Sequence, residues 1–153
     1  MAAYQIVVVP DPVLREKALP VTSFNQGLIR LLENMKDSLY EAEGVGLAAP
    51  QIGVLRRVVV FDAGDGLVEL INPRILEEEG EEAGIEGCLS IPNTRGLVKR
   101  AKRVVVEALN RYGENIRIEG EGLVARVIQH EIDHLDGILF TDRAEWVEGN
   151  GRK

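Results

Sequence analysis

The sequence predicts an α+β fold, in which short antiparallel strands pack around one central helix. Apolar residues recur at three- and four-residue intervals over 123–135, which is typical of a half-buried helix. Valine-rich segments meet at glycine-containing turns, which is typical of hairpins. The length of 153 residues suits one domain with a substantial core, so we expect a single domain over residues 1–153.

Composition narrows the class of protein. The net charge of −7 argues against a nucleic-acid-binding surface, which is usually basic. The apolar run Ile6–Val9 is too short for a signal peptide, and no stretch approaches the roughly 20 apolar residues of a membrane helix. A single cysteine cannot form an internal disulfide and suits a reducing compartment. We therefore expect a cytoplasmic protein with no direct nucleic-acid binding and no membrane association.

The first 43 residues predict an arm and a helix. Three prolines within residues 1–22 favour an extended or turned arm with at most one short helical turn. A helix should then run from a cap at Ser23 or Asn25 to about Glu43. Its apolar stripe packs in the core and consists of Leu28, Leu31, Leu32, Met35 and Leu39.

Gly44-Val45-Gly46 follows this helix and predicts a loop. Two glycines allow another chain to approach the backbone closely, as a peptide ligand requires, although an ordinary turn has the same signature.

Two hairpins come next in the chain. Between them lies an acidic run, Glu77–Glu82, which is typical of a solvated edge or loop. The hairpins join residues 56–62 to 67–72 around a turn at 63–66, and residues 98–109 to 115–119 around a turn at 110–114.

The helix at 123–135 contains both histidines of the chain, in His130-Glu131-Ile132-Asp133-His134. A spacing of four residues leaves the two imidazoles about 40° apart on one helix face, where both can reach one metal ion. Glu131 points off that axis but lies near enough to contact water at the metal, as a general base does in this motif. Two structural, hydrogen-bonded histidines on a half-buried helix are the alternative.

A third ligand is needed, because catalytic sites of this type use three protein ligands and leave one position for water. Cys88 is the soft candidate, and Gly87 before it favours a sharp turn that aims the sulfur, with Leu89–Ile91 continuing as a strand. A small buried hydrophobic residue is its other possible role.

Three motifs together carry a family resemblance. They are Gly44-Val45-Gly46-Leu47-Ala48-Ala49-Pro50-Gln51, Glu86-Gly87-Cys88-Leu89-Ser90 and His130-Glu131-Ile132-Asp133-His134. In this order, and over nearly the full chain, they resemble bacterial peptide deformylase. The resemblance implies one catalytic domain that removes the N-formyl group from the N-terminal methionine of newly made polypeptides and releases formate.

The resemblance also implies residue roles. Cys88, His130 and His134 hold the metal, Glu131 moves the proton, and the Gln51 side chain and the Leu89 backbone N–H stabilise the oxyanion. Substrate contacts are expected from Gly44, Val45, Gly46, Arg95, Leu123 and Val127. Ligand softness admits zinc, nickel, cobalt or iron; by resemblance Fe(II) is expected, and Zn(II), Ni(II) or Co(II) can substitute.

Partners and supporting residues follow from the same comparison. The expected partners are N-formylated nascent polypeptides. A transient ribosome contact through a long C-terminal helix is in doubt, because the chain after Asp142 allows only about two helical turns. Glu86 and Asp133 are candidates to orient a ligand histidine or the loop that carries Cys88; the alternative for each is a surface charge or a salt-bridge partner.

Two other functions fit parts of the pattern. A peptidase would use the same histidine motif, but it usually needs a further downstream ligand and no histidine follows His134. A binding module with a structural metal is normally closed by four protein ligands, and only three candidates are found.

Overall fold

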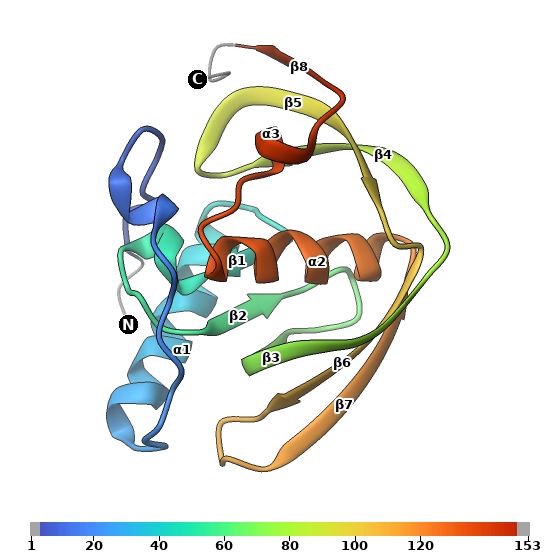
Figure 1. The fold of residues 1–153 in the computed structure, drawn as a ribbon. Helices are drawn as coiled ribbons and strands as arrows, with labels where there is room; N and C mark the ends of the chain where they lie inside the picture. Colours follow the sequence, from blue (N-terminus) through green and yellow to red (C-terminus); the bar gives the residue numbers. More distant parts are fainter. Residues whose placement is uncertain (1–3, 150–153) are drawn as a thin grey trace.

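The computed structural model describes residues 4–149 and has the predicted α+β architecture. A central helix, α2 (Leu123–Leu135), lies between a five-stranded sheet and a three-stranded sheet (Figure 1). The strands are β1 (Gly46–Ala48), β2 (Val58–Phe61), β3 (Val68–Glu79), β4 (Glu82–Cys88), β5 (Ile91–Arg100), β6 (Arg103–Leu109), β7 (Asn115–Glu121) and β8 (Trp146–Gly149). The sheets have the orders β1-β2-β3-β6-β7 and β4-β5-β8, and all pairs are antiparallel.

The N-terminal third agrees with the sequence-based prediction. The arm contains one short 3-10 turn, η1 (Pro12–Arg15), and α1 spans Gln26–Glu41. Asn25 caps α1 by accepting a hydrogen bond from the Leu28 N–H at 3.2 Å. The apolar stripe of α1 packs against one face of the five-stranded sheet.

The loop predicted at 44–46 is shorter than expected. Gly46 already begins β1, which pairs with β2 and leads through η2 (Ala49–Ile52) into the sheet. A Cβ on Gly46 would lie 2.7 Å from Glu131 Oε2 and 2.9 Å from Val127 Cγ1, so any side chain here would have to displace these groups of α2.

Both predicted hairpins are present, with two corrections. The acidic run is exposed, as expected for a solvated edge, but it is not a loop: Glu77–Glu79 belong to the long strand β3, and only Gly80 and Glu81 separate it from β4. Arg103 on β6 explains this, because its guanidinium forms ion pairs with Glu77, Glu79 and Glu119.

The second correction concerns the segment 98–109, which is two strands in different sheets. The break falls at Ala101 and Lys102, between β5 and β6. Gln129 on α2 holds this break, since its side chain accepts from the Ala101 N–H and donates to the Ala101 carbonyl. The chain thereby crosses α2 from one sheet to the other.

Helix α2 is buried by both layers. Its apolar residues pack with β2, β3 and β6, while polar side chains connect it to β5. Gly137 stops it in a left-handed conformation (φ +75°), and a Cβ there would lie 2.5 Å from the Arg15 carbonyl oxygen.

The tail differs from the short helix that its sequence allows. A single turn, α3 (Phe140–Arg143), is followed by β8, which pairs with β5. Residues 150–153 lie outside the described part of the chain. Among the described helices, none is long and apolar enough to cross a membrane.

Candidate metal and catalytic site

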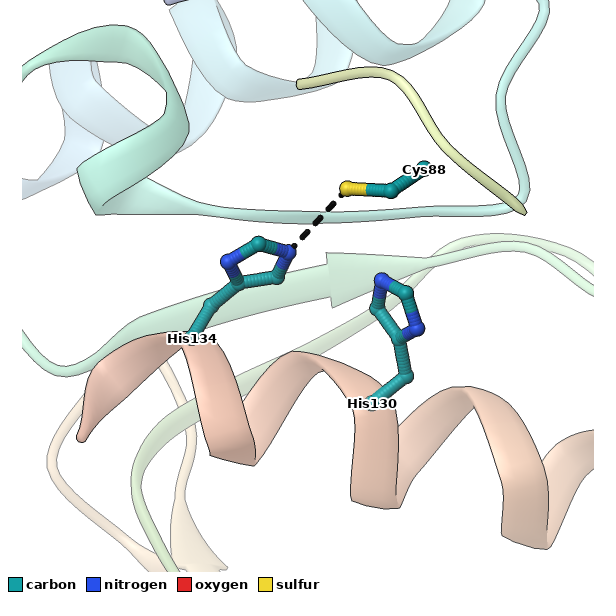
Figure 2. Close-up of side chains that lie close together, drawn as sticks. All are labelled: Cys88, His130 and His134. Carbon is teal, nitrogen blue, oxygen red and sulfur yellow. Dashed lines mark hydrogen bonds between the residues drawn. The ribbon is translucent and has the colours of Figure 1, made fainter. Parts of the chain in front are cut away.

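Cys88, His130 and His134 converge on one point between α2 and the end of β4 (Figure 2). One ligand atom from each lies within 4.8 Å of the others, and Cys88 Sγ is 3.2 Å from His134 Nε2. Thiolate and imidazole are the donors that zinc and the softer divalent transition metals prefer. The donor set therefore fits a divalent metal ion.

Local structure explains how these side chains meet. The two histidines are one turn apart on α2, with ring centroids 5.1 Å apart. Cys88 ends β4, and the register shift between Gly87 and Cys88 turns its side chain toward the helix. Leu89 and Ser90 form the turn into β5, so the predicted strand over 89–91 begins only at Ile91.

The outer nitrogen of His130 is fixed by a buried carboxylate. His130 Nδ1 lies 2.9 Å from Glu86 Oε1, which leaves Nε2 as the nitrogen available to a metal. Burial opposes ionisation of Glu86, but Arg100 and His130 outweigh it and hold the pKa of this carboxyl well below its usual range. The Glu86 carboxylate therefore accepts a hydrogen bond from the Nδ1–H of His130. This is the histidine-orienting role for which Glu86 and Asp133 were the candidates. The ring of Phe140 stacks on that of His130, with centroids 6.1 Å apart.

Glu86 belongs to a chain of buried charges. Arg100 donates to both of its oxygens at 2.7 and 2.9 Å and to Asp133 at 2.8 Å. Asp133 also accepts two hydrogen bonds from Arg143, so it is a salt-bridge partner of two arginines, which is one of the roles expected for it. This network of charged side chains connects β4, β5, α2 and α3. It therefore fixes the sheet that carries Cys88 relative to the helix that carries the histidines.

Arg126 extends this network along the cleft wall. It donates to Glu86 at 2.7 Å and to the carbonyls of Val98 and Glu82. Its guanidinium lies flat on Gly84, where a Cβ would be 3.0 Å from Cζ. Arg126 therefore ties α2 to both neighbouring strands at the edge of the site.

Glu131 is a buried acid, and one of its carboxyl oxygens forms no hydrogen bond with the described residues. Among the described residues, its Oε1 has no hydrogen-bond partner, and the side chain faces the cleft beside Gly46. Burial disfavours the charged form and raises the pKa of Glu131 to about 7. A carboxyl group with such a pKa can accept and release a proton near neutral pH.

Gln51 also contacts the sulfur of Cys88. Its Oε1 accepts from the Ala48 N–H, and its Nε2 donates to Ser90 Oγ at 3.1 Å and reaches Cys88 Sγ at 3.5 Å. The carboxamide is thereby held with its N–H group directed at the centre of the site.

A cleft with a volume of about 680 Å³ opens above these groups. Every residue predicted to bind substrate lines it, and so do both residues expected at the reacting carbonyl. These are Gly44, Val45, Gly46, Arg95, Leu123 and Val127, together with Gln51 and Leu89.

Sequence reasoning missed several residues at the site. Arg100, Arg126 and Arg143 gave no signal, because arginines on strands and helix ends are usually solvated. Ser90 belongs to the motif around Cys88. Its contact with Gln51 joins residues 39 positions apart, so no local sequence pattern predicts it. Glu43, far before Cys88 in the sequence, and Glu148, far after it, also line the cleft.

Comparison with known proteins agrees with this geometry. The family model for polypeptide deformylase matches residues 3–149. Similar proteins include the peptide deformylase of Carboxydothermus hydrogenoformans, 57% identical over 152 residues, which cover 99% of this chain and 100% of the relative. That of Desulfitobacterium hafniense is 61% identical over 145 residues, covering 95% and 97%.

The same family appears among solved structures. Peptide deformylase from Thermotoga maritima superposes with a TM-score of 0.92 at 47% identity, covering 94% of this chain and 99% of that one. The fold, the three-donor site and the matches over almost the whole length agree. The chain belongs to the peptide deformylase family, the metal-dependent hydrolases that remove the N-formyl group from nascent polypeptides.

Proposed function

We propose that Cys88, His130 and His134 hold one divalent metal ion and that Glu131 is the proton-transfer group in deformylation. The observation that carries this proposal is the convergence of a sulfur and two imidazoles beside a buried carboxylate oxygen that has no hydrogen-bond partner within residues 4–149. Three ligands leave a coordination position open, as in catalytic rather than structural sites. The histidine–carboxylate contact with Glu86 supports the assignment, since such contacts orient metal-bound imidazoles.

Ferrous iron is the metal we propose, with Zn(II), Ni(II) or Co(II) as substitutes. One thiolate and two imidazoles suit all four ions, and the choice of iron rests on the family resemblance. When bound, the cation supplies a Lewis acid that polarises the formyl carbonyl and lowers the pKa of water.

Glu131 handles the proton at its free oxygen. With Oε1 unpartnered and its pKa raised to about 7, Glu131 can take a proton from the attacking water and return it to the departing amine nitrogen. Both transfers occur at one carboxylate, so no second acid is needed.

Gln51 and Leu89 are proposed to stabilise the oxyanion. The Gln51 Nε2 is directed at the site by its contacts with Ala48 and Ser90, so little reorganisation is required when charge develops on the carbonyl oxygen. Leu89 follows Cys88 in the turn, where its backbone N–H lies one residue from the sulfur. Their crowding also favours the formyl group, the smallest acyl group.

The rest of the cleft suits a short peptide. Val45 and Leu123 are 41% and 55% exposed, and together with Val127 they line the cleft as an apolar surface that a methionine side chain would cover. Gly44 and Gly46 leave backbone free to approach an extended chain, and Arg95 lies further along the same cleft.

We further propose that residues 1–153 act as one catalytic domain, since α2 contacts both sheets. Its partners would be N-formylated nascent polypeptides in the cytoplasm, where the single thiol stays reduced. We also propose a transient ribosome contact; in the described part of the chain, residues Trp146–Gly149 form β8 rather than a helix.

The test is Glu131→Gln, with the exposed Glu121→Gln as control. We expect unchanged metal content by elemental analysis and a loss of formate release from formyl-Met-Ala-Ser of at least about 100-fold, because the general base is removed. The control should retain full turnover. Hydrolysis of internal peptide bonds instead of formate release would indicate a peptidase. Wild-type protein with bound metal but no turnover of either substrate would indicate a structural site.

A further inference from the structure

The tail strand β8 brings a carboxylate to the wall of the substrate cleft. Glu148 is directly opposite Arg95 in the β5–β8 register. Its Oε2 accepts a hydrogen bond from Arg95 Nε at 2.9 Å and lies 2.9 Å from Arg95 Nη2 in the same ion pair. Both side chains line the cleft and are more than half exposed. The one residue of this wall with a predicted substrate contact is therefore already paired with an acid.

The backbone pairing of β8 with β5 places Glu148 opposite Arg95. Gly149 adopts φ +122°, and a Cβ there would lie 2.0 Å from the Asn93 carbonyl oxygen. A Cβ on Gly96 would lie 2.7 Å from the Trp146 carbonyl oxygen. Only glycines allow β5 and β8 to approach this closely, so the register that opposes Glu148 to Arg95 is specified.

The balance of charge along the exposed part of the cleft is negative. Of the two arginines in the lining, Arg126 is held by Glu86 and two carbonyls, which leaves Arg95 as the exposed cation among the described lining residues. Glu43 and Glu148 are the exposed acids of the same cleft. Two carboxylates against one guanidinium favour basic over acidic peptide side chains.

We propose that Glu148 is a specificity-determining residue, which neutralises Arg95 and sets a preference for basic residues downstream of the formyl-methionine. This inference rests on the proposed function of the cleft. Without Glu148, the Arg95 guanidinium would be free to pair with an acidic peptide side chain. The effect is modest because the charges are exposed: exposed pairs change a rate or affinity by about twofold to fivefold.

The experiment compares amidated formyl-Met-Ala-Glu and formyl-Met-Ala-Lys, because amidation removes the terminal carboxylate. The measured quantity is the Lys-to-Glu ratio of kcat/KM, which divides out any general change in activity. We expect a ratio of about two to five in the wild type and a ratio at or below one in Glu148→Gln. Arg95→Gln should raise the ratio, and 0.5 M salt should reduce all differences.

Glu145→Gln is the matched control. Glu145 precedes β8, forms an ion pair of similar exposure with Lys99 at 3.0 Å and lies outside the cleft lining. It should leave the ratio unchanged. The inference is wrong if Glu148→Gln keeps the wild-type ratio or if Glu145→Gln shifts it equally. Absence of formate release from both peptides and from formyl-Met-Ala-Ser would instead contradict the proposed function. In that case the relative affinities of the two peptides, measured by calorimetry, still decide the role of Glu148.

Discussion

Replacing Glu86 by glutamine should weaken both the fold and the metal site. Glu86 is 6% exposed and accepts hydrogen bonds from Arg100, Arg126 and His130. A glutamine would remove the charge and turn an N–H group toward donors. Breaking one partner of a buried ion pair costs about 3–5 kcal/mol. For a domain of this length each kcal/mol corresponds to about 2–4 °C, so we expect Tm to fall by roughly 6–20 °C.

The same substitution acts on the metal through His130. Loss of the acceptor at Nδ1 should lower metal affinity by about 10- to 100-fold. Calorimetry of metal-free protein gives the stability term alone, and competition with a chelator for Zn(II) gives the affinity term. Glu82→Gln is the control, because Glu82 lies on the same strand with an exposed side chain. A loss of less than about 1 kcal/mol, or an unchanged affinity, would refute the idea that this network supports the site.

Three further predictions concern sterics, pH and the metal. Gly46→Ala should displace the Glu131 carboxylate, because the new methyl group would lie 2.7 Å from Oε2, and we expect kcat to fall at least about tenfold with metal content unchanged. Arg15 holds the pKa of Asp142 below its ordinary value of 3.8, so the stabilisation is present above that value and is lost as pH falls through the lowered pKa. Asp142→Asn should therefore lower Tm at pH 7, and its difference from the wild type, followed by circular dichroism, should narrow below about pH 4. With ferrous iron, activity should decline in air through oxidation at Cys88 or the metal and recover with reductant and Fe(II); stable activity after prolonged exposure to oxygen would exclude iron as the working metal.

The parts of the fold that follow from local pattern could be predicted from the sequence. Helix α2 was predicted over its observed range because its apolar period and its stop at Gly137 are local signals. Asn25 was one of two predicted caps for α1, and both hairpin turns lie where glycine-containing segments suggested.

The errors share a physical cause, which is contact between distant segments. Residues 98–109 form an unbroken strand pattern, yet the Gln129 side chain on α2 divides them at Ala101. Glu77–Glu79 have the composition of a loop, and Arg103 compensates their charge within a sheet. Neither contact has a signature in the local sequence.

The candidate site shows the same division. The metal-ligand set could be proposed because its chemistry is concentrated in few residue types: the chain has two histidines and one cysteine. The residues that hold this set in position, Arg100, Arg126 and Arg143, are three of many basic residues and become distinctive only through their contacts.

The two layers that meet at the site have unequal apolar support. The histidines lie on α2, whose apolar face belongs to a cluster of 13 buried residues in the described part of the chain, whereas the sheet that carries Cys88 packs on a cluster of five. Opening of the smaller layer alone would separate sulfur from imidazole without global unfolding. Amide hydrogen exchange in β4 and β5 of the metal-free protein should therefore be faster than in α2. The rate of alkylation of Cys88 should be limited by the same local opening. A bound metal would then slow both hydrogen exchange and alkylation, because it would link the sheet that carries Cys88 to α2, two parts whose apolar side chains belong to separate clusters.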